Sequence, residues 1–308
     1  FNNAVIKPDP LLLNGNGATE ESAIDEIRQL VELIYNKPET IRNICWKVYR
    51  FFVYAPHTPD RSVAIDSDII SAMAETFVAS NYKIQPVIEN LLRSEHFYEA
   101  GAGVTDDNFG GIIKSPLDIV TGTLRFFNIQ LPDIRTEPLA FYEATGEIIR
   151  SLGHLGMNFY DPYDVAGYEA YHQYPIYYRS WITPNYLARR YEFIRRVISA
   201  SEMGMFHVDV YEFVRDNFDY AVASDARLLI LELASYLLPI TDNLTFDENA
   251  DDSASLTAQR LNYFKDRFLQ QFDEAYWTTR WEKSAPDLRE QLEFLFNAML
   301  QSPEYQLS

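Results

Sequence analysis

Apolar residues recur along most of the chain at intervals of three and four positions, which places side chains on one face of an α-helix. The spacing predicts a helix over residues 38–54, whose apolar stripe includes the single cysteine, Cys45. It predicts another over residues 184–200, where Pro184 suits the first helical turn. The other predicted helices cover residues 20–35, 66–80, 84–98, 116–127, 141–152, 205–220, 225–238, 255–272 and 286–300.

Composition agrees with this helical pattern. The 308 residues include only 12 glycines, which favours helices over a β-fold rich in turns, and strands are expected to be minor at most. A hydrophobic content of 47% is enough to bury a substantial core in a chain of this length. We therefore expect an all-α protein, a compact multi-helix array of about ten to twelve helices.

A flexible segment divides the predicted helices. Residues 101–113 combine glycines with paired aspartates, a composition typical of a linker or hinge. Residues 1–18 carry Pro and Asn-Gly signals and are expected to form a flexible N-terminal tail. The sequence thus predicts an N-terminal helical lobe over residues 19–100 and a C-terminal helical lobe over residues 114–308. A single array without separate lobes is the alternative.

The most unusual stretch runs from Asn158 to Arg189. Residues 160–178 hold seven of the chain's 21 tyrosines in 19 positions. Several of them recur every third residue, and a polyproline II or 3₁₀ path would align these on one edge. Because Pro175 stops any helix running through it, we expect a long ordered Tyr-rich loop rather than a helix.

Two interpretations of this stretch compete. In the functional one, tyrosine and tryptophan rings line a groove for sugar rings, peptides or bases, and polar side chains complete the site. In the structural one, a long connection packs its rings across neighbouring helices. The candidate binding residues of the functional interpretation are Tyr163, Tyr168, Tyr171, Tyr174, Trp181, Arg189, His154, His172 and Asp164.

The helix predicted after this stretch has a basic side. In an acidic chain, clustered arginines can bind an acidic group of a substrate or partner, or they can pair with nearby carboxylates such as Asp161. The sequence leaves both possibilities open. The arginines are Arg189, Arg190, Arg195 and Arg196.

Charge and missing motifs exclude several classes of function. A formal net charge of -19 disfavours binding to nucleic acids and to anionic membranes, and no apolar run is long enough to span a bilayer. One cysteine allows no internal disulfide, and no phosphate loop, dinucleotide fingerprint or metalloprotease motif appears. The sequence therefore predicts no cofactor and no defined metal site. Convergence of His154 and His172 with Asp161 or Asp164 on a metal remains an alternative.

Several motifs resemble a bacterial family known only as domain-of-unknown-function family 1800. The family signature reads roughly Pro-Pro-Asn-Val-x-Gly-Trp, a spacer, Trp-Leu/Ile and a helix with Arg, and Tyr163, Asp164 and Tyr168 depart from it. Further matches are the helix end Leu91–Tyr98, the helix start at Lys114 and the closing stretch Ser302–Ser308. The signature residues present are Gly156, Phe159, Pro162, Val165, Ala166, Gly167, Trp181, Ile182 and Arg189.

The resemblance implies little mechanism, because the family has no established activity. It implies an exported protein, periplasmic or on the cell surface, and genes of the family often neighbour a sulfatase-like family, which is the expected source of a protein partner. Family members extend further towards the N-terminus. The chain is therefore expected to represent the C-terminal half to two-thirds of a longer protein.

Three hypotheses for function follow. The first is an exported, non-catalytic binding or scaffold protein whose Tyr/Trp-rich segment recognises a glycan or a protein partner. The second is a metal-dependent hydrolase with a site around His154, Asp161, Asp164 and His172, and with Arg189 as an anion clamp. The third is a structural half of a longer protein whose function lies nearer the N-terminus.

Overall fold

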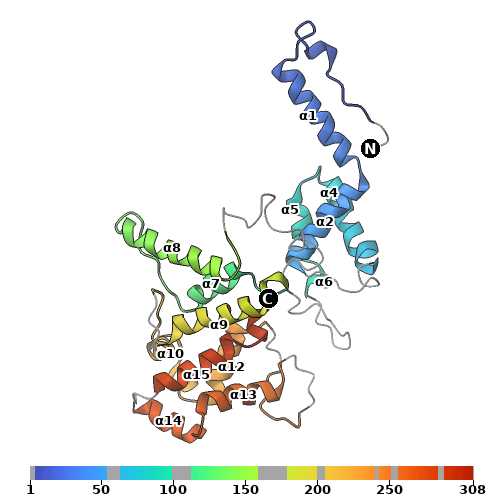
Figure 1. Ribbon diagram of the computed structural model, residues 1–308. Coiled ribbons are helices and arrows are strands. Elements are labelled where there is room, and N and C mark those ends of the chain that lie inside the picture. Colours follow the sequence, from blue (N-terminus) through green and yellow to red (C-terminus); the bar gives the residue numbers. More distant parts are fainter. Residues whose placement is uncertain are drawn as a thin grey trace. The chain divides into compact units, whose positions relative to one another are not determined.

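The computed structural model describes residues 4–53, 63–98, 112–158, 179–199, 205–239, 243–250, 256–283 and 288–307. Regular structure in these ranges is helical, with two isolated β-bridges and no β-strand, which confirms the all-α prediction (Figure 1). The chain divides into two compact units, residues 1–106 and 107–308, and each is described by itself. Within the described ranges, no helix has the length and apolar character needed to cross a membrane.

In the first unit α2 packs against α1, α4 and α5, and short links at residues 36–37 and 80–83 join α1 to α2 and α4 to α5. Short connections of this kind are typical of neighbouring helices in bundles. Its elements are η1 (Pro10–Leu12), α1 (Glu20–Tyr35), α2 (Pro38–Phe52), the π-helical turn η2 (Asp66–Ile70), α4 (Ser71–Ala79), α5 (Ile84–Leu92) and α6 (Glu95–Tyr98).

The core of this first unit forms around α2. Cys45 and Tyr49, one turn apart, are fully buried among apolar side chains, and burial raises the pKa of the Cys45 thiol to about 11. The hydroxyl of Tyr49 lies 2.8 Å from Nε2 of His96 in α6. Cys45 is therefore an inert packing residue, and His96 contributes to the packing of α6.

The second unit is larger and carries the candidate site. Its elements are α7 (Pro116–Phe126), α8 (Pro138–His154), η4 (Arg179–Trp181), α9 (Pro184–Ile198), α10 (Val210–Asn217), α11 (Tyr220–Ala223), α12 (Ala226–Leu237), α13 (Ala258–Leu269), α14 (Glu274–Glu282), α15 (Leu288–Leu300) and η5 (Glu304–Gln306).

Helix α15 is the centre of the second unit. Its apolar positions cover more than one side, so that Leu292, Leu295, Phe296 and Met299 are all fully buried. A helix that is apolar on several sides must be surrounded by other elements. Accordingly α15 packs against α9, α10, α12, α13 and α14. This core fixes α9, and α9 in turn positions the candidate site.

The beginning and the end of the second unit are held together. Ile113 forms an antiparallel bridge with Leu307, and the backbone N–H of Lys114 donates to the Gln306 carbonyl at 2.8 Å. Ser115 then caps α7 in a reciprocal capping box with Asp118. Residues separated by almost the whole unit thus share one junction.

Arg190 of α9 lies at this junction and is fully buried. Its guanidinium donates to the Lys114 carbonyl at 2.8 Å and to Oε1 of Gln306 at 3.2 Å. Burial lowers the pKa of Arg190 to about 10. The sequence analysis placed Arg190 on a basic side of its helix. The structure buries it instead, because it lies one turn before Ile194 in the buried stripe.

Lys114 shares this environment. Its Nζ lies 4.1 Å from the centre of the Tyr305 ring, a cation–π contact. Burial lowers the pKa of the Lys114 amine to about 8, and the nearby positive charge of Arg190 also acts to lower it. The junction therefore brings two cations close together in a largely buried site.

Candidate functional site

Helix α8 ends in a left-handed glycine that determines where His154 lies. Gly156 has a φ of +94°, the N–H of Met157 donates to the Leu152 carbonyl at 2.9 Å, and the N–H of Gly156 donates to the Gly153 carbonyl at 3.0 Å. This pair of bonds is the Schellman ending of an α-helix. His154 therefore belongs to the last helical turn, with its side chain exposed, and not to a loop between glycines.

The same glycine allows α8 and α9 to approach each other. A Cβ at Gly156 would lie 2.6 Å from the ring of Tyr186, so only a residue without a side chain fits beneath that ring. Tyr186 lies in the first turn of α9, where its N–H donates to Oγ1 of the capping residue Thr183 at 3.2 Å. The end of α8 is thus packed against the beginning of α9.

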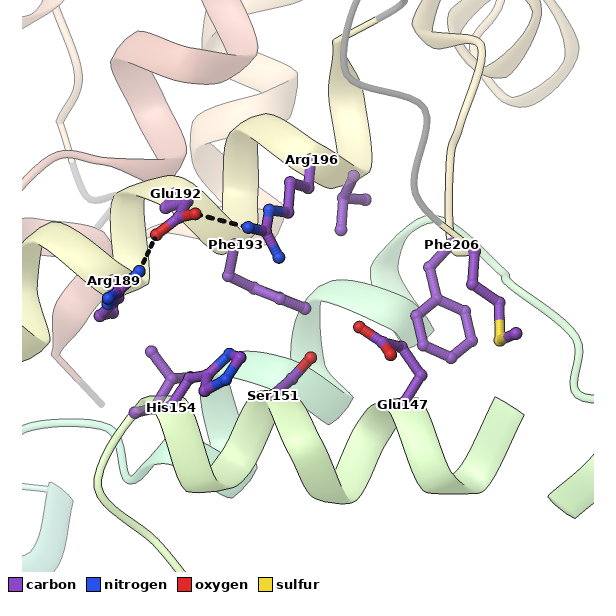
Figure 2. A pocket seen from close by; sticks show the side chains of 11 residues that line it. Glu147, Ser151, His154, Arg189, Glu192, Phe193, Arg196 and Phe206 are labelled. Atoms are coloured by element: carbon purple, nitrogen blue, oxygen red, sulfur yellow. Dashed lines mark hydrogen bonds and ion pairs between the residues drawn. The ribbon is translucent and has the colours of Figure 1, made fainter. Parts of the chain in front are cut away.

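A small cleft of about 50 Å³ lies between these two helices (Figure 2). Polar side chains of α8 face polar side chains of α9 across it, and apolar side chains form its base. Its volume admits a single functional group or one or two water molecules, not a whole ligand. The lining residues are Glu147, Ser151, His154, Leu155, Arg189, Glu192, Phe193, Arg196, Val197, Met205 and Phe206.

Helical periodicity explains why these polar residues converge. On α8, Glu147 is followed by Ser151 and His154 at intervals of four and three, which aligns them on one face. The side of α9 that faces them repeats the arrangement at intervals of three and four. Its members are Arg189, Glu192 and Arg196.

The α9 side is an ion-pair network centred on Glu192. Its Oε2 accepts from Nη1 of Arg189 at 2.7 Å, and its Oε1 accepts from Nη2 of Arg196 at 2.6 Å. The hydrogen bond from Arg189 is the largest cause that lowers the pKa of Glu192, so this carboxyl is ionised at neutral pH. Two guanidinium groups thus share one carboxylate, and N–H donors remain on both.

The opposite wall adds groups of several kinds. Glu147 forms an ion pair with Arg150 on its own helix, which partly neutralises its charge. Ser151 supplies a hydroxyl and His154 an imidazole. Phe193 and Val197 are buried at the base, where a low dielectric strengthens any interaction with a bound charge. This combination of donors suits a small anionic group.

Metal chemistry finds no support in the described part of the chain. Among those residues, no three or more His, Cys, Asp or Glu side chains are arranged to hold a metal ion. The cleft itself offers two carboxylates, but each is engaged by arginine. A metal ion there would have to displace arginine side chains.

The predicted site residues fall into three groups. His154 and Arg189 line the same cleft. Trp181 is only 8% exposed in η4, so most of its ring is closed to a ligand. The remaining candidate residues lie outside the described residues, as does most of the predicted Tyr-rich loop that carries them; they are Asp161, Tyr163, Asp164, Tyr168, Tyr171, His172 and Tyr174.

Sequence analysis did not select the other polar residues of the cleft. Glu147, Ser151 and Glu192 carry no signal of their own in the sequence, and Arg196 was placed only on a basic side of its helix. The available signal was the matched spacing of polar residues on the two helices that flank the Tyr-rich stretch. That signal becomes informative only once α8 and α9 are known to be neighbours.

Comparisons with known proteins give one match. A family model described as "Protein of unknown function (DUF1800)" matches residues 7–307, nearly the whole chain. Neither a curated protein nor a solved structure matches.

Proposed function

The chain belongs to the DUF1800 family, and from the charged cleft we propose that it is a non-catalytic binding or scaffold protein. The observation that carries the proposal is the convergence of Arg189, Arg196, Ser151 and His154 around a space sized for one functional group. These side chains are hydrogen-bond donors, whereas the carboxylates beside them are already paired. Such a site recognises an acidic group rather than transforming it.

The proposed ligand is a glycan or a protein partner that presents a carboxylate or a sulfate. Guanidinium groups bind such planar or tetrahedral anions through paired N–H donors, and these charge-assisted bonds are shorter and stronger than neutral ones. Because the cleft holds only about 50 Å³, the rest of the ligand must be bound elsewhere.

We propose that the Tyr-rich stretch contacts the rest of the ligand. The stretch joins the two helices of the cleft in sequence, since α8 ends at His154 and α9 begins at Pro184. Tyr163, Tyr168, Tyr171 and Tyr174 would provide aromatic faces, and His172 and Asp164 would add polar contacts. Trp181 would support the stretch from within the core, in keeping with its burial.

The cellular setting is proposed from the family resemblance alone. We propose that the protein is exported to the periplasm or the cell surface. A protein of the sulfatase-like family, whose genes often neighbour those of the resembled family, is then a candidate partner.

The test is a thermal-shift titration of the whole chain with oligosaccharides, uronate-containing and neutral, and with divalent metals. A ligand at a hundred times its dissociation constant stabilises by about 2.7 kcal/mol. In a unit of this size, that raises the melting temperature by roughly 5–10 °C. We expect an acidic oligosaccharide to give this shift and Arg189→Gln to remove it.

A matched control makes this test specific. Arg215 on α10 forms an ion pair with Glu212 at the same three-residue spacing, and its side chain is 48% exposed against 49% for Arg189. Arg215→Gln should leave the shift unchanged. Equal shifts in both variants would contradict binding at the cleft. A shift with a metal alone, removable by chelation, would favour the hydrolase alternative.

A further inference from the structure

A second hollow in the larger unit lies away from the cleft and shares no residue with it. It is formed by α9, α13 and α15, and its volume is about 280 Å³, close to the lower end of sites that hold small molecules. The residues that line it, here called the α13–α15 groove, are Tyr191, Arg260, Tyr263, Arg267, Phe294, Asn297, Ala298, Gln301, Ser302 and Pro303.

The walls of the groove differ in chemistry. On α13, Arg260, Tyr263 and Arg267 follow at intervals of three and four, so they form one stripe. The two arginines are seven residues apart, a rise of about 10 Å along the helix. The α15 wall carries Phe294, Asn297 and Gln301 at the same spacing. The α13 wall, with two arginines and a tyrosine, thus faces an α15 wall with a phenylalanine ring and two side-chain amides.

The two arginines are not equivalent. Nε of Arg260 donates to Oε1 of Glu304 at 2.8 Å, so its charge is compensated. The guanidinium of Arg267 is exposed and forms no ion pair or hydrogen bond with any residue in the described ranges. Arg267 is therefore the cation of the groove that is available to a ligand.

The amides leave hydrogen-bonding groups unused. Nε2 of Gln301 donates to Oδ1 of Asn297 at 2.7 Å, and Nδ2 of Asn297 donates to the Glu293 carbonyl at 2.9 Å. Each amide nitrogen carries a second N–H, and Oε1 of Gln301 remains an acceptor. Donors and acceptors side by side match the hydroxyl groups of a sugar.

Two tyrosines complete the site. Tyr263 is 45% exposed, and the Arg260 guanidinium lies 5.8 Å from the centre of its ring, so a ligand would pack on the ring face that Arg260 does not cover. Tyr191 is half-buried on the α9 side, and burial raises the pKa of its hydroxyl, so it remains a hydrogen-bond donor at neutral pH. Aromatic faces pack well against the C–H faces of sugar rings.

We propose that the α13–α15 groove binds a monosaccharide acid, with its ring against Tyr263, its hydroxyls on Asn297 and Gln301, and its carboxylate on Arg267. The net charge of the chain, -19, favours a ligand with one negative charge over a polyphosphate or a nucleic acid. The volume fits one sugar ring with its substituents, not an extended peptide. The proposal does not rest on binding at the cleft between α8 and α9.

The experiment is isothermal titration of the whole chain with glucuronate, with glucose and acetate as separate arms. Glucuronate should bind at least about tenfold more tightly than either, because only glucuronate combines ring, hydroxyls and carboxylate. Arg267→Gln should weaken glucuronate binding by about tenfold to a hundredfold, the range for one charge-assisted hydrogen bond. It should leave any glucose binding unchanged.

Matched variants define the site. Arg125 on α7 is exposed like Arg267, and Arg125→Gln should not alter binding. Tyr263→Ala should weaken the binding of both glucuronate and glucose. Tyr236→Ala, at an exposed position of α12, should weaken the binding of neither. No glucuronate binding, or equal affinity in Arg267→Gln and wild type, would overturn the proposal. Binding that disappears in Arg189→Gln and survives in Arg267→Gln would assign the sugar to the cleft instead.

Discussion

Two neighbouring arginines lie on opposite faces of α9 and have opposite environments. Arg189 faces the cleft, half-exposed, with its charge shared through Glu192. Arg190, the next residue, is fully buried and binds a backbone carbonyl and an amide oxygen instead of a carboxylate. Exposed ion pairs contribute little to stability, whereas buried polar groups that lose a partner cost much more. The difference separates a structural arginine from one available for binding.

The largest effect is expected at the buried face. Arg190→Ala should destabilise the larger unit by about 3–5 kcal/mol, because it leaves a cavity and two unpaired acceptors. The melting temperature should fall by roughly 6–20 °C. Calorimetry measures the loss, and Arg196→Ala on the opposite face is the control, with an expected loss below about 1 kcal/mol.

Arg190→Met separates the contribution of the side-chain stem to that loss from the contribution of the hydrogen bonds. Methionine restores most of the apolar stem but neither hydrogen bond, and it removes a charge that is costly to bury. Recovery of most of the lost stability would show that packing of the stem dominates. Equal stability of Arg190→Ala and wild type would contradict a structural role for this arginine.

The second effect concerns the junction of α8 and α9. Gly156→Ala should cost about 2–3 kcal/mol, because alanine is strained at a φ of +94° and its Cβ collides with the Tyr186 ring. Denaturant unfolding measures the loss. Adding Tyr186→Ala should relieve the collision but not the backbone strain, so a double-mutant cycle should show coupling between the two sites. Additive losses of stability would mean that the Tyr186 ring does not restrict the residue at position 156.

The third prediction concerns pH. Burial lowers the pKa of Lys114 from 10.5 to about 8, so between these values the unfolded chain binds more protons at this amine than the folded chain. The free energy of unfolding should therefore rise with pH across this window. Lys114→Met removes the titrating group. The stability difference, wild type minus variant, should increase from pH 8 to pH 10 and stay constant below pH 7.

The smallest effect on stability is expected at the exposed face. Arg189→Gln should change the free energy of unfolding by less than about 0.5 kcal/mol, since it breaks one solvent-exposed ion pair. The same variant should abolish the binding of an acidic ligand at the cleft. A large loss of stability here would place Arg189 among the structural arginines and would remove the contrast between the two faces.

Helices were the part of the structure that local sequence determined most clearly. The prediction of α9 began at Pro184 and ended within two residues of Ile198, because a capping threonine, an early proline and a regular apolar stripe all agree there. Helix α8 was predicted too short at both ends. The prediction covered residues 141–152, but the helix begins at Pro138, Gly153 lies within it and Gly156 follows its end.

Tertiary contacts explain what the sequence could not show. Arg190 occupies a core position in the helical repeat, but its charge suggested a surface residue. Its burial could not be predicted, because the acceptors of its hydrogen bonds belong to residues 114 and 306, which are distant in sequence. Likewise, Glu147 and Ser151 become part of a cleft only because α8 packs on α9. Of the two candidate residues found in the sequence, His154 lies just before the unusual stretch and Arg189 at its end, so their place in the chain brought them into consideration.

The bridge between Ile113 and Leu307 has a consequence for how the protein is made. The ribosome releases the chain in order, at about 5–20 residues per second. The acceptors for Arg190 include an amide at position 306, so this cation has no complete binding site while residues 300–307 are still inside the exit tunnel. Final closure of the larger unit must therefore wait until its last turn has left the exit tunnel, and Arg190 lacks one of its two acceptors until then.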